Sequence, residues 1–211
     1  MKPQRIDELT RRDHYYLGND DECYFFGEYS ARKGQSFSDT NELVVNLSLP
    51  VKYRNTPKWA KKERAINKVA QLFGAAFAAE RVRDVTFVPL PPVQPQDHPD
   101  YDDRMRAILK TMGDGLDVRE MIVMVPAREV LEIANLRLGP DVLFTNMRVD
   151  PTCANPAPVA IFLCGDVLVT GADFVAARRR LQQALPQVPV FGMFAARKLL
   201  ETDEFDDPAK F

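Results

Sequence analysis

The chain has 211 residues, of which 28 are basic and 30 are acidic, so its formal net charge is −2. Hydrophobic residues make up 45% of it, which excludes wholesale disorder and supplies enough apolar surface for a buried core. The near-neutral charge argues against a protein that coats nucleic acid through a general positive surface. No run of about 18 apolar residues predicts a membrane helix, and the polar N-terminus lacks the apolar core of a secretory signal. We therefore expect a cytoplasmic protein.

Cysteines and histidines are few. Cys23, Cys153 and Cys164 are odd in number and lack CxxC spacing, which argues against a disulfide framework or a zinc site. The two histidines, His14 and His98, lie in polar segments that we expect to be exposed. Three reduced thiols, and no catalytic machinery built on histidine, are the simplest interpretation.

The N-terminal quarter predicts an arm, a strand and a short helix. Residues 1–21 are polar and irregular, and Cys23 to Tyr29 has the composition of a strand. Ser38 or Asp39 can serve as the N-cap of the short helix that follows, and Pro50 ends whatever comes after it.

The clearest helical pattern begins at Thr56-Pro57, with Thr56 as N-cap and Pro57 at the first helical position, where its missing N–H costs nothing. The charged residues 61–64, Lys62 among them, are assigned to the solvent side. Apolar residues recur at helical spacing and predict a core-facing stripe of Trp59, Ile66, Val69, Phe73, Ala76 and Phe77.

The rest of the chain alternates short apolar runs with helical segments. Strands are expected over 85–90, 121–125, 142–149, 159–164 and 188–196, the third as a strand or an extended segment, and helices over 102–112, 127–136 and 173–185. This alternation predicts an α/β protein with a central, mainly parallel sheet flanked by helices. We divide it into an N-terminal arm and hood segment (1–55), an α/β core (56–198) and an acidic tail (199–211).

Ligands of such sheets bind beyond the carboxyl ends of the strands, so the loops after Leu90 and Cys164 are the candidate sites. In the second loop Asp166 follows the strand, and a Thr170-Gly171-Ala172 turn precedes a helix. Backbone N–H groups in such a turn, together with the positive end of the helix, favour an anion. Gly171 permits close backbone approach, and Asp166 can accept hydrogen bonds from the vicinal hydroxyls of a sugar.

This strand, Asp and turn resemble the phosphoribosyl pyrophosphate loop of the type I phosphoribosyltransferases. In that family an acidic pair holds the ribose hydroxyls and a Thr/Gly run wraps the 5′-phosphate. By position, Asp166 matches the second acid, Thr170 the second threonine, and Gly171 and Ala172 the next two residues. FVPLPP at 87–92, which includes Pro92, is similar to the family's first core strand and the loop that contacts pyrophosphate.

The resemblance extends over about residues 22–197. HPDYDDRMRAIL, FGEYSARKG, SDTNELVVNL, RVDP and FGMFAARK are similar to segments of a bacterial subgroup of phosphoribosyltransferase-like proteins, largely of unassigned function. This similarity implies the phosphoribosyltransferase fold, with a hood in residues 1–55 or 96–140 that recognises the acceptor.

Three positions depart from the family's pattern. Gly165 stands in place of the first acid and Val169 in place of the first threonine. Asp173 stands where the last threonine contacts phosphate; a carboxylate there repels the ligand, and it can instead serve as the N-cap of the next helix. The first loop also lacks a basic residue, so Arg104 and Arg106 are the nearest cations.

The resemblance implies a protein that binds phosphoribosyl pyrophosphate, or a related phosphorylated sugar or nucleotide, at the 165–173 loop. If active, it would transfer a ribosyl phosphate group to a nitrogenous base. Mg²⁺, held through Asp166, is the cofactor that the resemblance allows, and no organic cofactor is implied. The ligand-binding residues it indicates are Asp166, Thr170, Gly171, Ala172, Asp173, Pro92 and Arg104.

The departures from the pattern leave a second hypothesis open: a catalytically inactive module that acts through a protein partner. A homodimer is compatible with either hypothesis, because dimers are common among similar proteins. The basic run Arg178–Arg180 supports a third, weaker hypothesis of nucleic-acid contact, although a solvated helix face explains it more simply.

Overall fold

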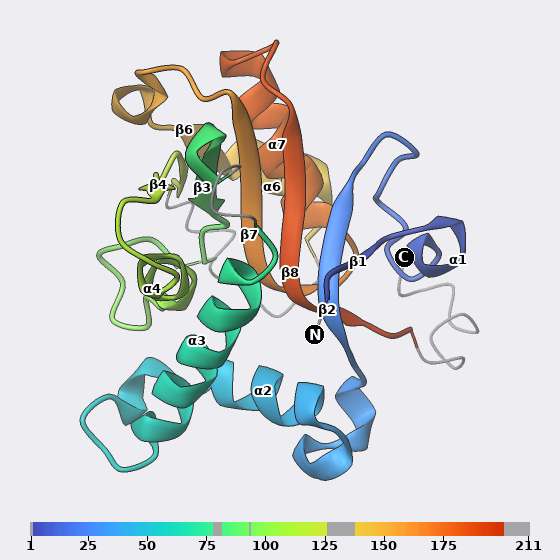
Figure 1. Ribbon diagram of the computed structural model, residues 1–211, viewed down its shortest axis with the longest axis vertical. Helices are drawn as coiled ribbons and strands as arrows, with labels where there is room; N and C mark the ends of the chain where they lie inside the picture. Colours follow the sequence, from blue (N-terminus) through green and yellow to red (C-terminus); the bar gives the residue numbers. More distant parts are fainter. Residues whose placement is uncertain (1, 78–81, 93, 126–137, 201–211) are drawn as a thin grey trace.

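The computed structural model of the chain describes residues 2–77, 82–92, 94–125 and 138–200. Its centre is a six-stranded sheet with the strand order β1-β2-β8-β7-β3-β4 (Figure 1). The strands span Gln4–Arg5 (β1), Cys23–Tyr29 (β2), Val85–Pro89 (β3), Asp117–Val118 (β4), Ala160–Leu168 (β7) and Val190–Lys198 (β8). All pairings from β2 to β4 are parallel, and only β1 pairs antiparallel, at the edge. The predicted α/β class with a mainly parallel sheet is confirmed.

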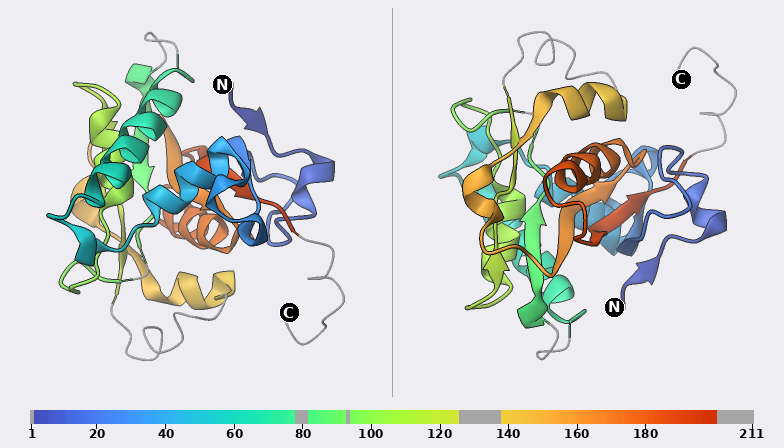
Figure 2. Two further views of the ribbon diagram at one scale, coloured as in Figure 1. Left: turned by 90° about the horizontal axis from the view of Figure 1, so that it is seen from below. Right: turned by 90° about the horizontal axis from the view of Figure 1, so that it is seen from above.

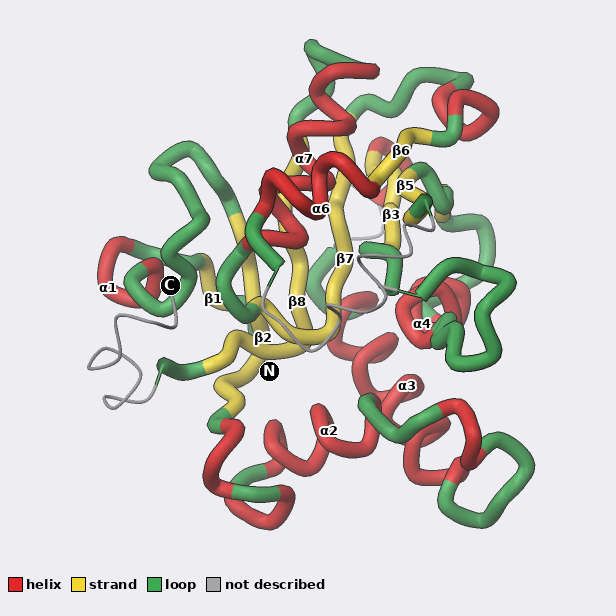
Figure 3. The backbone as a smooth tube through the Cα atoms, turned by 180° about the vertical axis from the view of Figure 1, so that it is seen from behind, coloured by secondary structure: helices red, strands yellow, loops and turns green. Residues whose placement is uncertain are grey.

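Helices cover both faces of this sheet, which is why the central strands consist of nearly continuous apolar residues. The helices span Glu8–Arg11 (α1), Asp39–Leu47 (α2), Trp59–Gly74 (α3), Arg104–Thr111 (α4), Pro140–Asn146 (α6) and Ala172–Ala184 (α7). The end views of Figure 2 place α6 and α7 at one side of the sheet and α3 at the other, and α6 and α7 lie in front of the strands in Figure 3. Within the described ranges, no helix has the length and apolarity needed to cross a membrane.

Two apolar clusters fill the space between the layers. Phe174 and Leu181 of α7 belong to the cluster on one face, and Val69 and Phe73 of α3 belong to the cluster on the other. A second, two-stranded antiparallel sheet of β5 (Ile122–Met124) and β6 (Met147–Val149) packs with the first cluster. Every residue of β3 is buried, in agreement with the predicted buried strand.

The predicted short helix and the strand before it are confirmed. β2 has the predicted bounds, and the hydroxyl of Ser38 caps α2 by accepting a hydrogen bond from the Asn41 N–H at 3.0 Å. The predicted start of α3 is wrong: the helix begins at Trp59, and the Thr56 hydroxyl donates to the Tyr53 carbonyl at 2.7 Å. Thr56 therefore closes a preceding turn, and its side chain is not free to cap the helix.

Two other predicted elements differ from the structure. The segment 142–149 is a strand only over β6; its first part belongs to α6, which Pro140 opens at the first helical position. β7 continues past Cys164 to Leu168, because Gly165 to Leu168 keep their pairing with β8. The predicted helix over 127–136 lies outside the described residues, as does nearly all of the acidic tail.

The N-terminal segment is packed against the sheet. β1 extends the sheet, and the guanidinium of Arg197 in β8 pairs with the Asp13 carboxylate at 2.6 Å. Arg178 of α7 pairs with the buried Asp21 at 2.8 Å. The expectation that His14 is exposed is wrong, because this segment carries it into the interior, where no part of it is accessible to solvent.

Candidate ligand-binding cleft

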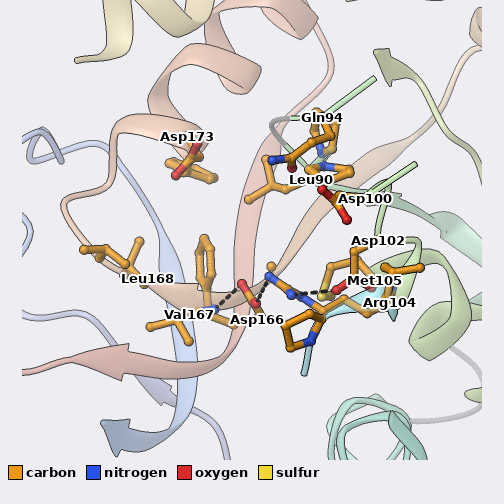
Figure 4. A pocket seen from close by; sticks show the side chains of 18 of the residues that line it. Leu90, Gln94, Asp100, Asp102, Arg104, Met105, Asp166, Val167, Leu168 and Asp173 are labelled. Atoms are coloured by element: carbon orange, nitrogen blue, oxygen red, sulfur yellow. Dashed lines mark hydrogen bonds and ion pairs between the residues drawn. The ribbon is translucent and has the colours of Figure 1, made fainter. Parts of the chain in front are cut away.

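A cleft of about 560 Å³ opens at the carboxyl ends of β3 and β7, next to the start of α7 (Figure 4). This is the edge where open parallel sheets bind ligands. Four charged groups from different elements matter most for its chemistry, and each is described below: Arg104, Asp102, Asp166 and Asp173. Its walls also include Pro50, Val51, Lys52, Leu90, Pro91, Pro92, Gln94, Asp100, Met105, Gly165, Val169, Gly171, Phe174 and Phe194.

Asp166 lies on β7 and not in a loop, since the strand extends to Leu168. One carboxylate oxygen accepts the Val167 N–H at 2.8 Å, and the other pairs with the Arg104 guanidinium at 2.7 Å. The side chain remains about 23% exposed, so it can be reached from the cleft. Asp166 is thus a carboxylate that strand pairing holds in place and one cation already partly neutralises.

Arg104 is the first residue of α4 and bridges two carboxylates. Its guanidinium contacts Asp166 on one side and Asp102 on the other, the second at 2.9 Å (Figure 4). Burial by itself lowers the pKa of Arg104, but the two carboxylates outweigh burial and raise it. The cation that the sequence offered as a candidate therefore does face the cleft. Arg106, the other candidate, does not line it and pairs with Glu120 at 3.2 Å.

Lys62 supports this arrangement from below. The prediction that it faces solvent is wrong: its side chain is 1% exposed, and its ammonium donates to Asp102 at 2.5 Å and to the Leu49 carbonyl at 2.8 Å. Burial lowers the pKa of Lys62, against the effect of Asp102. Lys62, Asp102, Arg104 and Asp166 form a chain of alternating charges that connects α3, α4 and β7.

The turn before α7 is partly closed to ligands. Thr170 and Ala172 are buried, and the Thr170 hydroxyl accepts the Ala172 N–H at 3.3 Å. Gly171 occupies the N-cap position with φ 86°, a left-handed conformation that favours glycine. Of the three turn residues predicted to bind ligand, Gly171 alone lines the cleft, together with its neighbour Val169.

Asp173 is not the N-cap of α7, contrary to the alternative interpretation of this residue, because Gly171 takes that position. The Asp173 side chain is open to the cleft, while protein atoms crowd it on the other sides. This crowding, and then the nearby charge of Asp166, raise the pKa of Asp173. A second carboxylate therefore sits beside the turn where a phosphate would be expected.

Gly165 has no room for a side chain. A Cβ built on it would lie 2.6 Å from a ring carbon of Phe194 and 3.1 Å from Leu90. Phe194 is on β8, directly opposite Gly165 in the parallel pairing. The missing first acid of the family's pattern is thus replaced by an aromatic ring from the neighbouring strand.

The charges that line the cleft are mainly negative. Lys52 and Arg104 face four carboxylates: Asp100, Asp102, Asp166 and Asp173. No cluster of three or more metal-donor side chains occurs in the described ranges, and Asp166 offers one carboxylate that is already engaged with Arg104. The chain's own donors do not fit the Mg²⁺ that the resemblance allows, so we derive no step through a metal.

Sequence reasoning missed Lys62 and Phe194, and it interpreted Asp102 only as a residue favoured by the helix dipole. A signal for Lys62 was present, because it precedes Ala65 and Val69 at helical spacing and so falls on the buried side of α3. No such signal exists for Phe194, since its relation to Gly165 arises only from strand pairing.

Comparison with known proteins adds no assignment: no family model matches this chain, and no curated protein matches it.

Proposed function

We propose that the chain is a phosphoribosyltransferase-fold protein that binds a phosphorylated sugar or a nucleotide in this cleft. The supporting observation is that Asp166, Arg104, Gly171 and Pro92, which come from separate segments, all line one cleft at the carboxyl edge of the sheet. In this proposal Asp166 accepts hydrogen bonds from ribose hydroxyls and Arg104 binds an anionic group of the ligand.

The Arg104–Asp166 ion pair favours a ligand that carries both chemistries. A diol without an anion would compete with Arg104 for Asp166, and an anion without a diol would compete with Asp166 for Arg104. A sugar phosphate offers a partner to each side chain, so neither charge is left unpaired in a partly buried site.

A second candidate is a binding module that no longer transfers a ribosyl group and acts through a protein partner. The Phe194 ring at Gly165 favours it, since the first acid of the ribose clamp has no space there. Asp173 favours it as well, because a second carboxylate at the turn opposes a dianionic phosphate.

Isothermal titration calorimetry with phosphoribosyl pyrophosphate, ribose 5-phosphate and nucleoside monophosphates, each with Mg²⁺, tests the proposal. We expect saturable binding of at least one of them, lost in Asp166→Asn and kept in Asp114→Asn, a change in an exposed turn outside the cleft. Absence of heat for every ligand at millimolar concentration would overturn the proposal.

The two candidates are separated by release of pyrophosphate from phosphoribosyl pyrophosphate when purine and pyrimidine bases are supplied. An active transferase releases it, whereas a binding module does not. In either case we expect Asp173→Asn to tighten binding of the phosphorylated ligand, because it removes a like charge at the turn. An unchanged affinity would show that the ligand's phosphate lies elsewhere in the cleft.

A further inference from the structure

The N-terminal segment holds the turn before α7 from behind. The ring nitrogen Nδ1 of His14 lies 2.5 Å from the Val169 carbonyl oxygen, and the Tyr16 N–H donates to the Thr170 carbonyl at 3.1 Å. A Cβ on Gly171 would lie 2.8 Å from the Leu17 side chain, which shows how closely this segment covers the turn. Two consecutive carbonyls of the turn are therefore bound by one segment on one side.

These contacts fix the direction of two N–H groups. In a trans peptide the C=O and the following N–H point in opposite directions. Because the Val169 and Thr170 carbonyls point to the N-terminal segment, the N–H groups of Thr170 and Gly171 point away from it, toward the side that the cleft occupies. Neither N–H has an acceptor among the described residues.

Histidine at position 14 supplies a hydrogen-bond donor and not merely bulk. A carbonyl oxygen can only accept, so Nδ1 must carry the proton. His14 is fully buried, and its Nε2 has no partner within the described part of the chain. An apolar residue would fill this space without burying an unpaired nitrogen, so what histidine adds is the Nδ1–H bond to Val169.

We propose that His14 is a positioning residue that turns the Thr170 and Gly171 N–H groups into the cleft as a pair of donors for an anionic oxygen of the ligand. Use of the pair by a ligand rests on the proposed function; the orientation itself does not. The neighbouring anchor, Arg197 with Asp13, keeps this segment in place. The turn thus retains a preorganised anion subsite even though Asp173 stands beside it.

The test compares His14→Asn, whose side-chain N–H can replace that of Nδ1, with His14→Leu, which fills the space without a donor. In ¹⁵N-correlated NMR spectra without ligand, we expect the Thr170 and Gly171 amide signals to shift in His14→Leu and to return toward wild-type positions in His14→Asn. Affinity for ribose 5-phosphate should fall about tenfold in His14→Leu, the loss of one charge-assisted hydrogen bond, and recover in His14→Asn.

Unchanged amide signals in a folded His14→Leu variant would overturn the inference, whatever the ligand data show. If wild-type protein binds no ribose 5-phosphate while the amides shift as expected, the proposed function fails and the orientation of the turn stands. If His14→Leu does not fold, the ¹⁵N spectrum of wild-type His14 decides: protonation at Nε2 instead of Nδ1 contradicts the inference, and protonation at Nδ1 supports it.

Discussion

At the scale of single residues, Gly165 shows that the departure from the phosphoribosyltransferase pattern is not a simple loss. The position is enclosed by the Phe194 ring and Leu90, so no acid could be restored there without rebuilding the neighbouring strand. Asp166, one residue further, keeps a supported and accessible carboxylate. Adjacent positions of one strand therefore have opposite fates, because successive side chains point to opposite faces of a sheet.

The packing at Gly165 predicts a large effect from one added carbon. Gly165→Ala should destabilise the protein by about 1–3 kcal/mol, the usual cost of overpacking a core, as measured by urea denaturation. In a Phe194→Leu background, where the aromatic ring carbons are absent, the same change should cost less.

Gly74→Ala is the matched control, because its added Cβ comes no closer than 3.6 Å to any neighbour. We expect it to leave stability unchanged or to raise it. Equal costs for Gly165→Ala in both backgrounds would show that Phe194 is not the obstacle.

At the scale of elements, the alternating charges from Lys62 to Asp166 hold the walls of the cleft together. Lys62 in α3 also binds the Leu49 carbonyl, next to the residues 50–52 that form the opposite wall. Asp102 is the centre of this chain, since it lies between two cations. The position of α4 relative to β7 consequently depends on electrostatics as well as on apolar packing.

This arrangement predicts unequal effects from its two ends. Asp102→Asn leaves Lys62 buried without a carboxylate and should cost about 3 kcal/mol in the free energy of unfolding. Lys62→Met leaves Asp102 paired with Arg104 and should cost ~1 kcal/mol, the value of the lost bond to Leu49. Urea denaturation of both variants measures the difference. A larger cost for Lys62→Met would mean that Lys62, and not Asp102, organises the cluster.

At the scale of the whole molecule, the N-terminal segment links the sheet edge to the cleft. It adds β1 to the sheet, pairs with β8 and α7 through two ion pairs, and buries His14 against the turn. Burial lowers the pKa of His14, and Arg197 lowers it further, while the Val169 hydrogen bond and Asp13 oppose the shift. Folding therefore favours the neutral ring.

This shift predicts a loss of stability in mild acid. Since the folded-state pKa lies below the unfolded value of 6.5, the unfolded chain binds more protons in that window. Stability is fully present above 6.5 and falls as pH decreases toward the folded-state pKa, by at most about 1.4 kcal/mol per pH unit. Urea denaturation at pH 7 and pH 5 should show this decline in the wild type and a smaller one in His14→Asn. An equal decline in both would assign the effect to other groups.

Several elements were predictable because their signals are local. The β2 and β3 runs, the Ser38 cap of α2 and the α/β alternation follow from propensity, capping and apolar periodicity. The errors lie where tertiary contacts override those rules. Thr56 bonds to a preceding turn, β7 continues because β8 pairs with it, and Lys62 is buried because Asp102 waits there.

The sequence by itself determined the fold class and the region of the candidate site, since both depend on the order of short apolar runs and on the residues that follow them. Only the tertiary structure decided which of those residues meet. It joined Arg104 to Asp166, filled the place beside Gly165 with Phe194, and brought His14 behind the turn. The net charge of −2 gave no sign that carboxylates outnumber cations in the cleft. Such pairings join residues far apart in the chain, so no local pattern encodes them, and folding alone creates the field that a ligand meets.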